Sequence, residues 1–305
     1  MIMKNNKLQI ERLILGTAQL GMPYGIANKT GRPDQKTATK IIETAWNQGV
    51  KEFDTAQGYG DCESVLGKAF ADLKISNHVR VISKFGHQID HLNENVMEEE
   101  LEKSLEKLNI PFFWGMMLHS EDLLAKWSEG LGEIFQKLIQ SQKIRKVGFS
   151  VYSPEKALEA LDQDGIDFIQ IPGNVLDRRF EKAGVFELAQ IKNKQIHIRS
   201  IFLQGLLLMD LEEIPGKMKY AIPVIEKLIK LSMQFGMTRK EMAMGYIKNA
   251  FPDSHVLFGV DSVDHVKGNM ESWLQKYPND LVNKVKTLFD DVPENIINCN
   301  MWKQT

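Results

Sequence analysis

The chain has 305 residues but only two cysteines, Cys62 and Cys299. Two thiols can build neither a disulfide framework nor a four-cysteine zinc site. No apolar run reaches transmembrane length, and the start of the chain, MIMKNNKLQI, lacks the long apolar stretch of a signal peptide. We therefore expect a soluble, cytoplasmic protein that does not act in a membrane.

An excess of basic residues is also missing. Lysine and arginine total 38 against 40 aspartates and glutamates, which gives a net charge of −2. Nucleic-acid surfaces usually need a clear basic excess, so nucleic acid is not an expected partner. No Pro/Gly/Ser linker or low-complexity tract divides the chain, and 43 % of the residues are hydrophobic. One domain over residues 1–305 follows.

What recurs along the chain is a short apolar segment followed by an amphipathic helix. In the first such helix, over residues 34–49, Asp34 is the expected N-cap and Gly49 the expected end. Alternation of this kind predicts a parallel sheet, and eight units in about 250 residues fit a closed (β/α)8 TIM barrel. The open doubly wound alternative lacks its G-x-G-x-x-G turn. The expected strands cover residues 12–16, 50–55, 79–84, 113–119, 144–150, 167–172, 195–200 and 255–260.

Four titratable residues stand at or just beyond neighbouring strand ends: Asp54, Tyr59, Lys84 and His119. In a barrel these ends form one working face, so the four side chains should meet in one cleft. Lys84, held by Asp54, would lower the pKa of Tyr59, and His119 could donate a hydrogen bond to a carbonyl that Tyr59 protonates. No side chain delivers two electrons, so a hydride cofactor is implied. Taken singly, each residue also has a structural explanation, such as a helix cap, a loop contact, a solvated lysine or a core histidine.

Five segments resemble the aldo-keto reductase superfamily: GTAQLGMPYG, FDTAQGYGDCESVLG, ISKFG, LHS and RSIFLQGLLL. The resemblance runs from about residue 12 to residue 270. It implies a (β/α)8 barrel that reduces an aldehyde or ketone with NADP(H), less often NAD(H). It also implies that Asp54, Tyr59, Lys84 and His119 are the catalytic tetrad, with Tyr59 as the proton donor.

The same resemblance implies a cofactor site along strands one and five to eight. Val151 replaces an asparagine common after strand five, and basic residues are scarce in the adenosine loop, where only Lys267 lies near. NADP(H) is therefore the expected cofactor, with NAD(H) an open alternative. The implied cofactor residues are Gly16, Thr17, Ser150, Gln170, Arg199, Ser200, Leu203, Gln204, Gly205, Gly259, Ser262, His265 and Asn269.

Arg199 takes the position of an aromatic residue that stacks on the nicotinamide in many members. A planar guanidinium can also stack, but it would repel oxidised nicotinamide. One hypothesis is that Arg199 favours the reduced cofactor. The alternative is that Arg199 is an ion-pair partner at the rim of the site.

For the substrate pocket we expect contributions from Tyr24, Phe85 and Asn174, with residues 206–222 as a lid. The pair Arg178 and Arg179 could attract an anionic substrate such as a sugar phosphate, or could simply be solvated. The segment HQIDH (87–91) has metal-like spacing but lacks the H-E-x-x-H pattern, so no metal is expected.

The sequence therefore favours an NADP(H)-dependent reductase of a small-molecule carbonyl compound, including a sugar-derived one. It is expected to act as a monomer or weak homodimer. Two rivals remain: a cofactor-binding regulatory or scaffold protein with little turnover, and a barrel lyase or isomerase without a cofactor.

Overall fold

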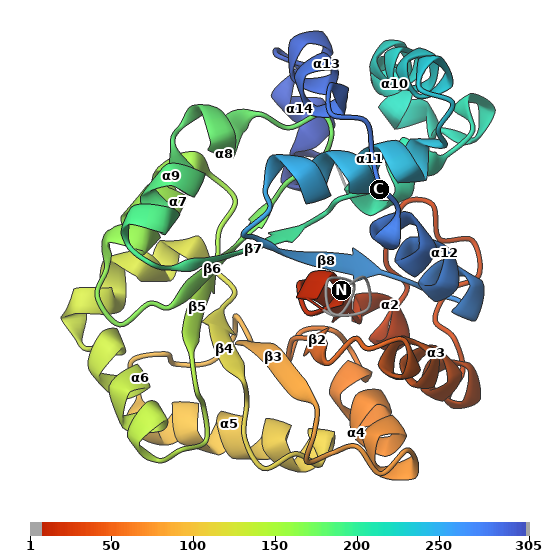
Figure 1. The fold of residues 1–305 in the computed structure, drawn as a ribbon. Coiled ribbons are helices and arrows are strands. Elements are labelled where there is room, and N and C mark those ends of the chain that lie inside the picture. Colours follow the sequence, from red (N-terminus) through yellow and green to blue (C-terminus); the bar gives the residue numbers. More distant parts are fainter. Residues whose placement is uncertain (1–7, 303–305) are drawn as a thin grey trace.

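The computed structural model describes residues 8–302. Eight parallel strands form one closed barrel in chain order, with β1 paired to both β2 and β8, and the helices surround it (Figure 1). The predicted (β/α)8 barrel is confirmed. The strands are Leu13–Gly16 (β1), Glu52–Asp54 (β2), Arg80–Phe85 (β3), Gly115–Leu118 (β4), Val147–Ser150 (β5), Phe168–Pro172 (β6), Gln195–Arg199 (β7) and His255–Gly259 (β8).

Helices follow the strands around the outside of the barrel (Figure 1). The predicted first helix is α3, in which the Asp34 side chain accepts a hydrogen bond from the Thr37 N–H at 2.8 Å. Gly49 follows it with φ +102°, a conformation that glycine adopts without steric cost. The α-helices are Ala18–Gly21 (α2), Gln35–Asn47 (α3), Cys62–Asp72 (α4), Glu94–Leu108 (α5), Leu131–Gln140 (α6), Pro154–Asp162 (α7), Arg179–Lys182 (α8), Val185–Ile191 (α9), Ile222–Gln234 (α10), Arg239–Ala250 (α11), Val263–Leu274 (α12), Leu281–Leu288 (α13) and Glu294–Ile297 (α14).

Alternation along each strand separates two apolar layers. Residues that point inward fill the barrel, while their neighbours pack against the helices. Gly148 of β5 faces the inner layer, because a Cβ there would lie 2.6 Å from the Phe168 ring. Lining this layer are Ile14, Ile82, Met117, Phe168 and Leu257. This apolar packing fills the barrel interior, and the polar residues at the carboxyl ends of the strands lie beyond it.

The segment after β7, predicted as a lid, folds into three short 3₁₀ helices: Leu203–Leu208 (η2), Leu211–Glu213 (η3) and Gly216–Ala221 (η4). Buried leucines and Met218 anchor it to the barrel. Its backbone also meets the loop after β1, where the Ala27 N–H donates to the Gln204 carbonyl at 3.4 Å. An ion pair between Lys29 and Glu213 joins the same two loops.

Two further 3₁₀ helices complete the elements: Glu121–Glu129 (η1) after β4 and Cys299–Met301 (η5) near the C-terminus. Over residues 8–302, none of the helices has the length and apolar composition that crossing a membrane requires.

Candidate active site

A buried ion pair joins the ends of β2 and β3. Lys84 Nζ lies 2.7 and 2.9 Å from the two carboxylate oxygens of Asp54 and donates to the Thr55 carbonyl at 2.9 Å. Gln170 of β6 reaches across the barrel, and its Nε2 donates to Asp54 Oδ2 at 2.8 Å. Asp54 is therefore fixed by donors from two different strands, which holds Lys84 in one orientation.

Close backbone packing holds Tyr59 above this pair. The Tyr59 N–H donates to the Ala56 carbonyl at 3.0 Å. Gly21 of α2 lies so close that a Cβ on it would stand 2.0 Å from the Tyr59 carbonyl oxygen. Below the ring, Lys84 Nζ is 5.0 Å from its centroid. The loop is thus stiffened by α2, and only glycine at position 21 allows this approach.

His119 follows β4 directly and completes the predicted group. Its ring centroid lies 6.1 Å from that of Tyr59 in an edge-to-face arrangement, and His87 stacks on it at 4.6 Å. Burial first, and then the positive charge of Lys84, lower the pKa of His119 to about 3. The imidazole is therefore neutral at pH 7, and a neutral ring still has one N–H to donate.

One electrostatic expectation is wrong. Burial, followed by the negative charge of Asp54, raises the pKa of Tyr59 above its ordinary value. Both carboxylate oxygens of Asp54 offset the charge of Lys84. Arg199 is the cation that opposes this rise and lowers the Tyr59 pKa.

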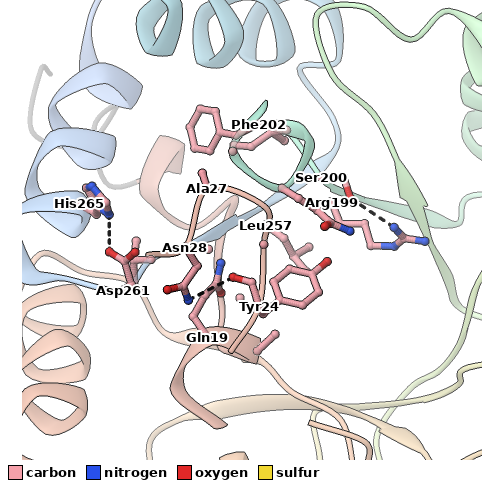
Figure 2. Close-up of a pocket in the computed structure, with 18 of the residues that line it drawn as sticks. Gln19, Tyr24, Ala27, Asn28, Arg199, Ser200, Phe202, Leu257, Asp261 and His265 are labelled. Carbon is pink, nitrogen blue, oxygen red and sulfur yellow. Dashed lines mark hydrogen bonds and ion pairs between the residues drawn. The ribbon is translucent and has the colours of Figure 1, made fainter. Parts of the chain in front are cut away.

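A cavity of about 360 Å³ opens at the carboxyl ends of the strands, and neither Lys84 nor His119 is among the residues that line it. Figure 2 shows Asp261 and His265 at one end of it and Arg199 with Ser200 at the other, with Tyr24 nearer the latter. Asp54 and Tyr59 contribute to its wall. A long cleft with Tyr59 in its wall suits an extended ligand whose reacting end lies beside the phenol.

Most of the residues expected at the cofactor line this cavity: Gly16, Thr17, Gln170, Arg199, Ser200, Gln204, Gly205, Gly259 and His265. Four others do not line it. Ser262 caps α12 by accepting from the His265 N–H at 3.2 Å, while Ser150, Leu203 and Asn269 are buried. The three buried residues lie within the packed structure, and Ser262 stands partly exposed at the start of α12, away from the cavity wall.

Of the three expected substrate residues, only Tyr24 lines the cavity. Phe85 follows Lys84 on β3 and faces the opposite way, where it is buried and packs edge-to-face on Phe135 at 5.9 Å. Asn174 is buried too, and its Oδ1 accepts from the Leu176 N–H at 2.9 Å. The placement of Phe85 and Asn174 contradicts the expectation that they line the pocket.

The two arginines after β6 serve the fold. Arg178 is buried and donates to the Val175 carbonyl at 2.6 Å and to the Tyr246 hydroxyl. Arg179 pairs with Asp177 and Glu294, each at 2.8 Å. Arg179 remains partly exposed, but both side chains are engaged by groups of the protein and neither lines the cavity, so the expectation that they attract a substrate does not hold.

The structure also adds wall residues that the sequence pattern did not reveal. Gln19, Asn28, Phe202 and Asp261 all line the cavity. Tyr152 lies under Arg199, whose Cζ is 4.3 Å from the Tyr152 ring centroid. Gln19 lies in the four-residue helix α2 and the others stand on irregular loops, so no periodic pattern marks the direction of these side chains.

The HQIDH segment has a different use from the one its spacing suggests. His87 stacks on His119, and His91 is buried. Within residues 8–302, no three side chains of His, Cys, Asp or Glu gather in a way that could hold a metal ion.

Comparison with known proteins fits this geometry. The sequence profile of the aldo/keto reductase family matches residues 12–290. The chain belongs to the aldo/keto reductase family. Over 184 residues it is 28 % identical to aldo-keto reductase YhdN of Bacillus subtilis, covering 58 % of this chain and 54 % of YhdN. The match thus spans about half the length of that curated relative.

Solved structures of low identity share the fold. An aldo-keto reductase of Bacillus halodurans in its holo form aligns with a TM-score of 0.73 at 22 % identity, over 91 % of each chain. An aldo/keto reductase of Klebsiella pneumoniae, in complex with NADP and acetate, aligns with a TM-score of 0.70 at 19 % identity, again over 91 % of each chain.

Proposed function

We propose that this aldo/keto reductase reduces an aldehyde or ketone, including one derived from a sugar, to the alcohol with NADP(H). The observation that carries the proposal is the juxtaposition of four groups on one barrel face. The buried Lys84–Asp54 pair, the Tyr59 phenol above it and the neutral His119 ring meet where β2, β3 and β4 end. This arrangement suits the protonation of a carbonyl oxygen.

Tyr59 gives its hydroxyl proton to the carbonyl oxygen, and His119 donates a hydrogen bond to the same oxygen. When bound in the cleft, a reduced nicotinamide would supply the hydride for the carbonyl carbon. Because burial raises the pKa of Tyr59, the phenol stays protonated at neutral pH and is available as the acid. Lys84 stabilises the phenolate as it forms, and Asp54 keeps Lys84 in place. The proton then returns to Tyr59 from water.

The wall of the cleft fits a nicotinamide nucleotide. After β7, Gln204 and Gly205 have φ +53° and +98°, and both line the cavity. Ser200 and Gln19 add polar groups. At Gly205 a Cβ would stand 2.4 Å from Ala27 Cβ, so a larger residue would push the two loops apart. Strained backbone at the wall of a cleft is a common mark of a binding segment.

Tyr59→Phe tests the proposal. We expect the rate of reduction of a reactive aldehyde to fall about 10²- to 10⁴-fold, as for the loss of a general acid, with NADPH affinity unchanged. Stopped-flow assays and fluorescence titration measure the two quantities. Equal turnover by both proteins would exclude Tyr59 as the acid. NADPH binding with no turnover of any carbonyl in the wild type would instead favour the regulatory or scaffold role.

At the end of the cleft where the adenosine would lie, one carboxylate favours NAD(H) over NADP(H). Asp261 lines this end, with its Oδ1 2.6 Å from His265 Nδ1, and Arg199 at the far end is the only lysine or arginine among the wall residues described. A carboxylate there repels a 2′-phosphate. We expect Asp261→Asn to tighten NADPH binding about 2- to 10-fold and to leave NADH binding no tighter. Fluorescence titrations measure both, and equal effects on the two nucleotides would place Asp261 away from the 2′ position.

A further inference from the structure

Within residues 8–302, no carboxylate is paired with the Arg199 cation at the end of the cleft beside Tyr59. Arg199 is the last residue of β7 and lines the cavity. Its Nη1 donates to Ser200 Oγ at 3.3 Å, and its Nη2 is buried with no hydrogen-bond partner among the described residues. Across residues 8–302, no acidic side chain forms an ion pair with it. The rim ion pair considered from the sequence is therefore not observed.

Stacking alone does not satisfy this group. One face of the guanidinium already lies over the Tyr152 ring, with Cζ 4.3 Å from its centroid. A nicotinamide on the other face would leave the N–H groups of Nη2 unpaired, because they point along the plane of the guanidinium. A buried donor on a charged group needs an acceptor in that plane, and a carboxylate matches its geometry with two parallel hydrogen bonds.

The neighbours of Arg199 place this acceptor near the reacting carbonyl. The charge of Arg199 lowers the pKa of Tyr59 and also acts on Tyr24 and His119. Among the described wall residues it is the sole lysine or arginine. A single cation balances the charge of a singly charged oxyanion and not that of a phosphate dianion. Hydroxyl groups nearby are further hydrogen-bond donors to such an anion.

We propose that Arg199 binds a carboxylate of the substrate, so that the carbonyl compound reduced is an oxo acid or an aldehyde that carries a carboxylate. This inference rests on the proposed reduction beside Tyr59. Arg199 is then the specificity-determining residue of the reaction, and the Tyr152 ring orients its guanidinium by stacking on one face.

Two matched substrate pairs test it: pyruvate with methyl pyruvate, and 4-carboxybenzaldehyde with methyl 4-formylbenzoate. Within each pair, the ester lacks the negative charge and carries one additional methyl group. Comparing variants with the wild type removes differences in intrinsic reactivity between the two compounds. Arg199→Met removes the charge, and Arg199→Lys keeps it without the planar pair of donors. Arg145→Met is the control, because Arg145 also stacks on an aromatic ring, that of Phe112 at 4.6 Å, but does not line the cavity.

We expect Arg199→Met to raise KM for the carboxylate member about 10- to 100-fold, with a much smaller change in kcat and none in the KM of the ester. Arg199→Lys should be intermediate, and Arg145→Met should match the wild type. Equal losses for acid and ester would overturn the proposal. So would a changed affinity ratio of NADPH to NADP⁺ without a change in substrate preference, because Arg199 would then act on the cofactor.

Calorimetric titration with 4-(hydroxymethyl)benzoate and its methyl ester separates this inference from the proposed function, since it needs no turnover. One outcome is that the wild type binds the acid, that Arg199→Met no longer binds it, and that no carbonyl compound is reduced. The anion site is then supported and the reductase proposal fails. If the esters are reduced normally and the acid binds no better than its ester, the reductase proposal stands and the anion site fails.

Discussion

At the residue scale, the Lys84–Asp54 pair makes a stability prediction. Both side chains are buried, so removing one leaves the other charge without its partner. We expect Lys84→Met to lower the free energy of unfolding by about 3–5 kcal/mol, and the double variant Lys84→Met/Asp54→Asn to recover part of it. The control Lys103→Met, which breaks exposed pairs with Glu99 and Glu100, should cost less than about 1 kcal/mol.

Urea unfolding at pH 7 compares these four proteins. Equal losses in Lys84→Met and Lys103→Met would show that the buried pair serves orientation and adds no stability. A double variant as unstable as the single one would show that the loss comes from packing and not from the unpaired carboxylate.

Also at this scale, some sequence predictions were confirmed and others were wrong for identifiable reasons. Asp54 and Lys84 meet because both occupy inward-facing positions at or next to the carboxyl ends of neighbouring strands, and the positions of the strand ends alone predict this. The prediction that Phe85 lines the pocket is wrong because consecutive residues of a strand face opposite sides of the sheet. The predicted direction of the Tyr59 pKa shift is wrong because it depends on how completely the charge of Asp54 offsets that of Lys84. This depends on distances in three dimensions, which the spacing along the chain does not give.

At the element scale, the loop after β7 makes the second prediction. Gly205 has φ +98°, and a Cβ there would stand 2.4 Å from Ala27 Cβ on the loop after β1. Gly184 has φ +77° but nothing within 4 Å of its Cβ position. Gly205→Ala should therefore combine backbone strain with a clash, whereas Gly184→Ala carries strain alone, about 1–2 kcal/mol.

Fluorescence titration with NADPH and urea unfolding separate the two effects. We expect Gly205→Ala to weaken NADPH binding at least about 10-fold, because the Ala27–Gln204 contact shapes the wall that we propose for the cofactor. Gly184→Ala should lose stability but keep its NADPH affinity. Unchanged affinity in Gly205→Ala would show that the cofactor does not use this wall.

The elements themselves differ in how far the sequence predicts them. Strands and helices such as β3 and α3 have periodic apolar positions, so their bounds came within a few residues. The segment 206–222 has no single period, and its three 3₁₀ helices were expected only as a loop. Long-range contacts such as the stacking of Arg199, at the end of β7, on Tyr152, in the loop after β5, leave no local signal in the sequence.

At the scale of the whole molecule, the barrel encloses a histidine that restricts its stability in acid. His197 is buried between Phe168, on which it stacks at 4.5 Å, and His255 at 5.0 Å. Burial, and then the positive charges of His255, Lys146 and Lys84, hold its pKa well below the ordinary value. The interior of the barrel thus accepts this ring only as the neutral form.

The sign of the pH dependence follows from this depressed pKa. The unfolded chain protonates His197 near pH 6.5 and the folded chain does not, so stability is complete above that pH and falls as the pH drops below it. His197 contributes up to about 1.4 kcal/mol per pH unit, and His119, with its pKa of about 3, contributes in the same direction. We expect His197→Phe to reduce the loss of stability between pH 6.5 and 5 by up to about 2 kcal/mol. Urea unfolding at several pH values measures this difference, and His78→Gln, which changes an exposed histidine, is the control. If the free energy of unfolding of the wild type and both variants fell equally steeply with falling pH, the folded barrel would admit the proton, for example by opening to water.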